Sequence, residues 1–198
     1  MIGILDLGIC NLKSIHSAVC SLGYDIKIIN QTNFKDIKDM SRMILPGVGS
    51  YSNISKNLHN SSDLSEELNK HVISGKYFLG ICLGMQFLST KGYEHGLSKG
   101  LNFIPGKVIK IETEKNLKIP HIGWNEIKIL EKNKILNEIE ENTNFYFVHS
   151  FYFVPDEKKT ILAETNYGIK IPAIVMKNNI FGFQFHPEKS SKKGLKLL

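Results

Sequence analysis

The stretch that decides the fold reads YFLGICLGMQ and covers residues 77–86. Its first half is apolar and predicts a buried strand at residues 77–81. Glycines two residues either side of Cys82 permit a sharp turn into a helix, which is expected to open at residues 84–88. This pattern is the cysteine form of a nucleophile elbow, and amides at the helix start favour a thiolate. We therefore interpret Cys82 as a nucleophile; the two flanking glycines disfavour the alternative of a buried structural cysteine.

Strands and helices alternate through the first half of the chain. The predicted strands are residues 2–5, 25–30, 43–45 and 77–81, and Pro46-Gly47 is expected to stop the third. The predicted helices are residues 11–22 and 64–74, each closed by a glycine. This alternation is typical of an α/β fold with a doubly wound, mostly parallel sheet. Cys82 would then lie at the carboxyl edge of the sheet, where ligands bind.

The second half contains short strands with few helices between them. They are predicted at residues 108–111, 126–130, 145–148, 161–165, 171–175 and 180–185. We interpret them as antiparallel additions to the sheet or as an attached β layer. Residues 191–198 begin a helix that stops abruptly, which leaves open whether the natural chain extends beyond Leu198. The length suits one core, so residues 1–198 are expected to form a single domain.

Composition and charge restrict the classes of function. Hydrophobic residues make up 42%, yet no apolar run approaches the ~20 residues that span a bilayer, so no membrane partner is expected. Three cysteines without CxxC spacing disfavour a disulfide scaffold or a zinc site and fit a reducing cytoplasm; Cys10 and Cys20 are interpreted as structural. The net charge is +6, but every basic residue except Arg42 is lysine. Because base and phosphate recognition relies on bidentate arginine, nucleic-acid binding is disfavoured.

A general base for Cys82 is found in the stretch FGFQFHPE, residues 181–188. An apolar strand is expected to deliver His186 at its end, with Pro187 terminating the strand. Glu188 can then hold His186 Nδ1–H while Nε2 faces the sulfur, as a cysteine hydrolase requires. A histidine at a strand end and a solvated loop carboxylate are the alternatives, and the pairing with a cysteine elbow disfavours both.

Donors for a tetrahedral oxyanion are expected in the stretch LPGVGS, residues 45–50, which follows the third predicted strand. Its glycines allow unusual backbone angles, so its amides can join that of Leu83, the residue after the nucleophile. An ordinary turn at a strand end explains these residues equally well.

Taken together, PGVG, GICLGMQ and FHPE resemble the class I glutamine amidotransferases, in which a Cys-His-Glu triad hydrolyses glutamine. Two further stretches, IPHIGWN at 119–125 and YFVHSF at 146–151, resemble the glutaminase subunits of imidazole glycerol phosphate synthase. The resemblance spans essentially the whole chain. It implies a flavodoxin-like fold, no cofactor and no metal.

The resemblance also implies roles for particular residues. Cys82, His186 and Glu188 match the triad, and Val48 and Leu83 match the oxyanion-hole amides. Positions lining the glutamine pocket are matched by Gly49, Gln86, His149 and Ser150. Positions facing the partner subunit are matched by Asn11, His121 and Trp124. Core packing is the alternative for Trp124, the only tryptophan in the chain.

The resemblance implies a (βα)8-barrel cyclase as heterodimer partner. The cyclase would use the ammonia to form imidazole glycerol phosphate and aminoimidazole carboxamide ribonucleotide in histidine biosynthesis. The chain departs from the family at Leu7 and Cys10, at Phe151 and in residues 91–96. These departures leave open a paralogous glutaminase that feeds an amide- or amidine-forming synthase of surface sugars. A regulatory module that binds without turnover is a third possibility, which the intact triad disfavours.

Overall fold

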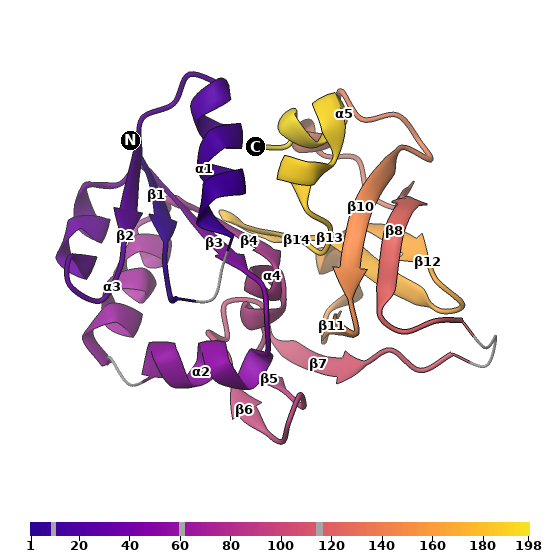
Figure 1. Ribbon diagram of the computed structural model, residues 1–198, viewed down its shortest axis with the longest axis horizontal. Helices are drawn as coiled ribbons and strands as arrows, with labels where there is room; N and C mark the ends of the chain where they lie inside the picture. Colours follow the sequence, from indigo (N-terminus) through magenta and orange to yellow (C-terminus); the bar gives the residue numbers. More distant parts are fainter. Residues whose placement is uncertain (9–10, 60–61, 114–116) are drawn as a thin grey trace.

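The computed structural model describes residues 1–8, 11–59, 62–113 and 117–198 (Figure 1). Cys10, interpreted above as structural, lies outside these residues. A mixed sheet of eight strands runs through the molecule in the order β2 (Ile26–Ile29), β1 (Ile2–Leu5), β3 (Arg42–Gly47), β4 (Tyr77–Cys82), β14 (Ile180–Phe183), β13 (Lys170–Lys177), β12 (Ile161–Asn166) and β9 (Lys128–Ile129). Among the described residues, no helix is both long enough and apolar enough to cross a membrane.

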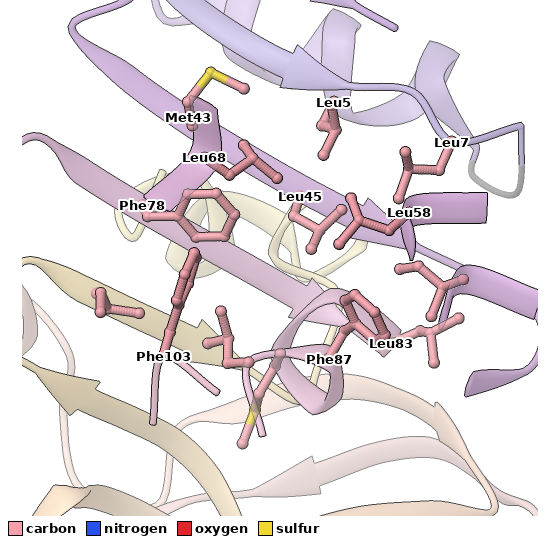
Figure 2. Close-up of a cluster of buried hydrophobic side chains, with 14 of the residues drawn as sticks. Leu5, Leu7, Met43, Leu45, Leu58, Leu68, Phe78, Leu83, Phe87 and Phe103 are labelled. Carbon is pink, nitrogen blue, oxygen red and sulfur yellow. The ribbon is translucent and has the colours of Figure 1, made fainter. Parts of the chain in front are cut away.

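The first five strands in this order are parallel, and helices cover both of their faces. On one face Ile4 and Ile44 pack with Ile15 of α1 (Leu12–Ser21). The other face carries Leu45 and Phe78, which belong to one buried cluster with side chains of α2 (Tyr51–His59) and α3 (Ser62–Ile73) (Figure 2). Because both faces are buried, these strands are apolar without alternation. The predicted doubly wound architecture is confirmed.

The antiparallel strands of the second half form part of the main sheet and also two smaller sheets. β13, β12 and β9 extend the main sheet. One small sheet pairs β8 (His121–Glu126) with β10 (Asn144–His149). The other has the order β11 (Phe151–Pro155), β7 (Gly106–Lys110), β5 (Lys91–Gly92) and β6 (Ser98–Lys99). The chain thus passes from one small sheet to the other at Ser150.

Two predictions about the sheet are wrong in detail. β14 is not an antiparallel addition, because it lies parallel to β4 in the middle of the main sheet. β3 does not stop before Pro46-Gly47 but continues to Gly47, which pairs with Cys82. The register with β1 ends at Ile44, so the missing N–H of Pro46 lies beyond that pairing.

Several other elements were not predicted from the sequence or were predicted at the wrong residues. The strand expected at 126–130 is divided, with β8 ending at Glu126 and β9 comprising Lys128–Ile129. Helix α2 and strands β8 and β11, which were not predicted at these positions, complete the surroundings of the elbow, whereas helix α4 (Leu83–Phe87) lies within one residue of its predicted place. The final helix, α5 (Ser191–Leu195), begins as predicted. Short 3-10 helices are η1 (Phe34–Asp39), η2 (Lys134–Leu136), η3 (Lys158–Thr160) and η4 (Pro187–Lys189).

Candidate active site

Cys82 occupies a sharp turn between β4 and α4, as the glycine spacing predicted. Its φ is 55°, a left-handed value that is costly for a residue with a side chain. A Cβ atom on Gly84 would overlap the carbonyl oxygen of Leu45, and one on Gly80 would meet the carbonyl of Gly84. The turn therefore packs backbone against backbone, and only glycine fits at these two positions.

His186 and Glu188 form a buried ion pair beside this turn. The distance from His186 Nδ1 to Glu188 Oε1 is 2.8 Å, and the two side chains are 4% and 6% exposed. His186 lies three residues beyond the end of β14, where its backbone N–H donates to the carbonyl of Tyr146. Ser190, which the sequence interpretation missed, donates its hydroxyl to the His186 carbonyl at 2.6 Å. Hydrogen bonds thus fix both the ring and the backbone of His186.

The protonation of His186 depends on both neighbours. Burial lowers the pKa of His186, but its interactions with Cys82 and Glu188 outweigh burial and raise the pKa to about 10. The buried Nε2 atom makes no hydrogen bond among the described residues. The Cys82 sulfur therefore lies close enough to influence this nitrogen without completing a hydrogen bond. Nε2 is available to exchange a proton with the sulfur or with a ligand.

A cavity of about 280 Å³ opens over the sulfur. Its lining comprises Val48, Gly49, Cys82, Leu83, Gln86, Glu94, Pro120, Val148, His149, Ser150, Phe151 and His186. A larger, mainly apolar cavity of about 580 Å³ includes the first residues of several strands, such as Arg42 and Tyr77, and none of the candidate site residues. We assign the chemistry to the smaller cavity because it contains the nucleophile and the base.

The structure gathers most of the predicted site residues at this cavity. Glu188 and Asn11 lie at an adjoining recess, which Val48 and His186 also line. Gly47 pairs with Cys82, so the PGVG segment runs directly beside the elbow, and Gly49 has a φ of 111° that favours glycine. Trp124 is 54% exposed on β8, so the alternative of core packing for this residue is wrong.

Three residues near the sulfur were not identified as site residues from sequence. Glu94 lines the cavity and accepts a 2.6 Å hydrogen bond from the Tyr51 amide at the start of α2. Phe151 contributes its carbonyl oxygen, which accepts from Gln86 and from His149. The tyrosine hydroxyl that is missing at Phe151 is therefore not needed for these contacts. Gln184, fully buried, donates to the Cys82 sulfur at 3.8 Å.

His149 and His121 form a buried pair whose proton positions follow from their partners. His149 Nδ1 is 2.9 Å from the Phe151 carbonyl, which can only accept, so this nitrogen carries the hydrogen. In a neutral ring, Nε2 of His149 then accepts from His121 Nδ1 at 3.1 Å. His121 Nε2 in turn accepts from the Asn125 amide at 3.4 Å. Both nitrogens of His149 are occupied, so it contributes a ring face and not a donor to the cavity.

Acid should destabilise the protein through this pair. Burial lowers the pKa of His121 to about 4 and that of His149 to about 3, below the ordinary 6.5. Between pH 6.5 and these lowered pKa values, the two histidines bind protons in the unfolded chain but not in the folded chain. The free energy of unfolding therefore falls as the pH drops below 6.5. We expect a loss on the order of a few kcal/mol by pH 4, measured by urea denaturation.

A double variant tests this assignment, because His121→Gln and His149→Gln together remove both titrating groups. Its free energy of unfolding should vary less between pH 6.5 and pH 5 than that of the wild type. An equally steep decline in the double variant would show that other groups cause the acid sensitivity.

Comparison with known proteins agrees with this geometry. Residues 3–198 match the glutamine amidotransferase class-I family. The chain therefore belongs to the class-I glutamine amidotransferases, and the predicted glutaminase class is confirmed. Within the residues that the structure describes, no group of three or more His, Cys, Asp or Glu side chains is placed to hold a metal ion.

The chain is similar in sequence to synthase subunits named HisH. The chain is 44% identical to the imidazole glycerol phosphate synthase subunit HisH of Caldanaerobacter subterraneus subsp. tengcongensis, covering 100% of this chain and 95% of that protein. It is 39% identical to subunit HisH of Aquifex aeolicus, covering 98% and 92%. The solved structure of PurLQS from Thermotoga maritima shares the fold, with a TM-score of 0.78 at 18% identity over 99% of this chain and 94% of that chain.

Proposed function

We propose that this chain is the glutaminase subunit of imidazole glycerol phosphate synthase. It hydrolyses L-glutamine and passes the ammonia to a (βα)8-barrel cyclase in histidine biosynthesis. The observation that carries the proposal is the buried Cys82–His186–Glu188 set at a cavity of about 280 Å³, in a chain whose similar proteins bear that name. The chain acts as a single domain in the cytoplasm, where Cys20 and Cys82 stay as free thiols.

The reaction begins with attack of the Cys82 sulfur on the carboxamide carbon of glutamine. The amides of Val48 and Leu83 stabilise the oxyanion of the tetrahedral intermediate. His186 then donates its proton to the leaving nitrogen, which departs as ammonia and leaves a glutamyl thioester. Water attacks the thioester with His186 as base, and glutamate and the free thiol are regenerated. Glu188 holds the imidazole through Nδ1 and does not itself transfer the proton.

Two acceptors in the cavity suit the ammonium group of an amino acid. Gln86 uses its Nε2 atom on two protein acceptors, so its Oε1 atom is the end left for a ligand. Glu94 supplies a carboxylate oxygen from the opposite segment of the lining. We infer that these oxygens bind the α-ammonium group, while Gly49, Ser150 and the face of His149 surround the remainder of glutamine.

The surface for the cyclase includes the outer side of β8. Ile122 and Trp124 are 59% and 54% exposed, and the Trp124 ring is held at 6.1 Å from that of Tyr146 on β10. Pro120, immediately before β8, lines the cavity over Cys82. Ammonia released there would therefore emerge beside β8. Asn11 lies at the adjoining recess and extends the same contact surface.

Truncation of Trp124 tests the partner assignment. The wild-type chain, mixed with the cyclase from the same genome, should form a complex that yields one glutamate per product. Trp124→Ala should weaken the complex about 30-fold, because aromatic anchors at interfaces contribute about 2 kcal/mol or more. Glutamate release should then exceed product formation. Titration calorimetry and the ratio of the two products measure both effects.

Tyr24→Ala is the matched control, since Tyr24 is also an exposed aromatic residue, on a loop before β2, at 45% exposure. It should leave affinity and coupling unchanged. Failure of the wild-type chain to bind the cyclase would contradict the proposed function. If the Trp124→Ala variant kept wild-type affinity and coupling, Trp124 on β8 would not be part of the interface.

A further inference from the structure

Gln184 lies beside the nucleophile and is not a member of the Cys82–His186–Glu188 set. It is fully buried, and its backbone N–H donates to Ala173 of β13, which fixes its place one residue beyond β14. Its side chain makes two contacts, one with Gln86 at 3.1 Å and one with the Cys82 sulfur at 3.8 Å. Core packing alone does not explain a buried carboxamide, because burying this polar group without hydrogen-bond partners is unfavourable.

The orientation of the Gln184 carboxamide follows from its neighbours. Gln86 contacts the Phe151 carbonyl at 2.7 Å, and a carbonyl only accepts, so the contacting Gln86 atom is nitrogen. The same nitrogen contacts Gln184, so the atom that it meets there is the oxygen Oε1. The other end of Gln184, which faces the sulfur, is therefore the NH₂ group. This assignment holds however the amides were first oriented.

The surroundings of the sulfur differ between its two protonation states. As a thiol, Cys82 donates to the Val148 carbonyl at 3.8 Å. As a thiolate, Cys82 has no hydrogen to donate, and the Val148 carbonyl, which can only accept, does not stabilise it. The thiolate then has Gln184 as a neutral N–H donor, beside the His186 ring, whose Nε2 atom makes no hydrogen bond among the described residues. Hydrogen bonds to charged groups are roughly twice as strong as neutral ones.

We propose that Gln184 is a further catalytic residue, which donates its carboxamide N–H to the Cys82 thiolate while its carbonyl oxygen fixes the orientation of Gln86. The proposal rests on the proposed role of Cys82 as nucleophile. It links two parts of the site that the reaction uses in different steps. The donor end supports the attacking sulfur, and the acceptor end leaves Gln86 Oε1 for the substrate.

The test is alkylation of Cys82 by iodoacetamide across pH, with Gln184→Met and Gln184→Leu as two apolar replacements of similar size. Mass spectrometry of the Cys82 peptide separates it from the other cysteines. At pH 7 both variants should react about 10- to 100-fold more slowly, and their pH profiles should move to higher pH. In the complex, kcat for glutamine should fall by a similar factor and KM should rise, because Gln86 also loses its partner.

Two control variants separate this role from a structural one. Gln86→Met removes the donor to the Gln184 carbonyl oxygen but not the Gln184 NH₂ group, so it should raise KM for glutamine and slow alkylation less than the two Gln184 replacements do. Asn179→Leu removes a carboxamide that donates to the carbonyls of Val72 and Lys76. Asn179 precedes β14, at the opposite end of this strand from Gln184, so its replacement should lower only the melting temperature. A folded Gln184 variant with the wild-type alkylation profile would overturn the proposal. If glutamine turnover instead survived loss of the Cys82 sulfur, the proposed nucleophile itself would be wrong.

Discussion

Cys82→Ala is expected to abolish glutamine hydrolysis while the partner cyclase still forms product from added ammonium. The sulfur makes the covalent thioester, and the described residues lining the cavity include no second thiol. Removal of a nucleophile from a triad typically costs a factor of about 10⁴ or more in turnover. Added ammonium bypasses the thioester, so that activity depends only on the cyclase. Release of glutamate and formation of product, measured in parallel, give the two rates.

Cys20→Ala is the matched control for this result. Cys20 is an exposed thiol on α1, in contact with His16 and remote from the cavity lining. The control variant should keep both the glutamine-dependent and the ammonium-dependent rates. Glutamine turnover in Cys82→Ala above about one part in a thousand would exclude the thioester route.

Gly84→Ala is expected to have the largest effect on stability. Its added methyl group would overlap the Leu45 carbonyl, which belongs to β3 at the point where Leu45 pairs with Gly80 of β4. Neither backbone segment can yield without breaking the turn that carries Cys82. We expect a loss of about 3 kcal/mol or more, which corresponds to a fall in melting temperature of about 6–12 °C for a chain of this length.

Gly75→Ala is the control for the loss of glycine alone. Gly75 has a φ of 83°, but an added Cβ would meet nothing within 4 Å. Its replacement should cost about 1–2 kcal/mol through the left-handed backbone only. Thermal unfolding of the two variants compares the costs directly. Equal shifts in melting temperature would show that the close approach of Gly84 to Leu45 adds nothing to the cost of the Gly84→Ala substitution.

The parts of this structure that were predicted from sequence have strong local patterns. The parallel strands are apolar without interruption, and the G-x-C-x-G spacing is local, so both the sheet and the elbow were identified. His186 and Glu188 were found because they are two residues apart. The triad residues, the oxyanion segment and the pocket residues lie together as expected, although their roles remain predictions.

The remaining features depend on contacts between distant segments. β8 reads HIGWNE, which has no apolar run, and only pairing with β10 makes it a strand. β14 looks like its antiparallel neighbours in composition, and its parallel pairing is decided by β4, about a hundred residues earlier. Glu94 and Gln184 have no local signature, because their partners are Tyr51 and Cys82. Such residues could be recognised only when the fold had placed them.

The position of β14 also bears on how the protein is made. Its residue Ile180 pairs with Phe78, and Gly182 pairs with Gly80, so one long edge of β4 has no partner until residues 180–183 have left the ribosome. At about 5–20 residues per second, the hundred intervening residues take roughly 5–20 s to synthesise. Throughout that interval β4 presents an unpaired apolar edge, which can pair with a strand of another chain. The same delay keeps His186 away from Cys82, so the nascent chain cannot hydrolyse glutamine before its sheet is complete.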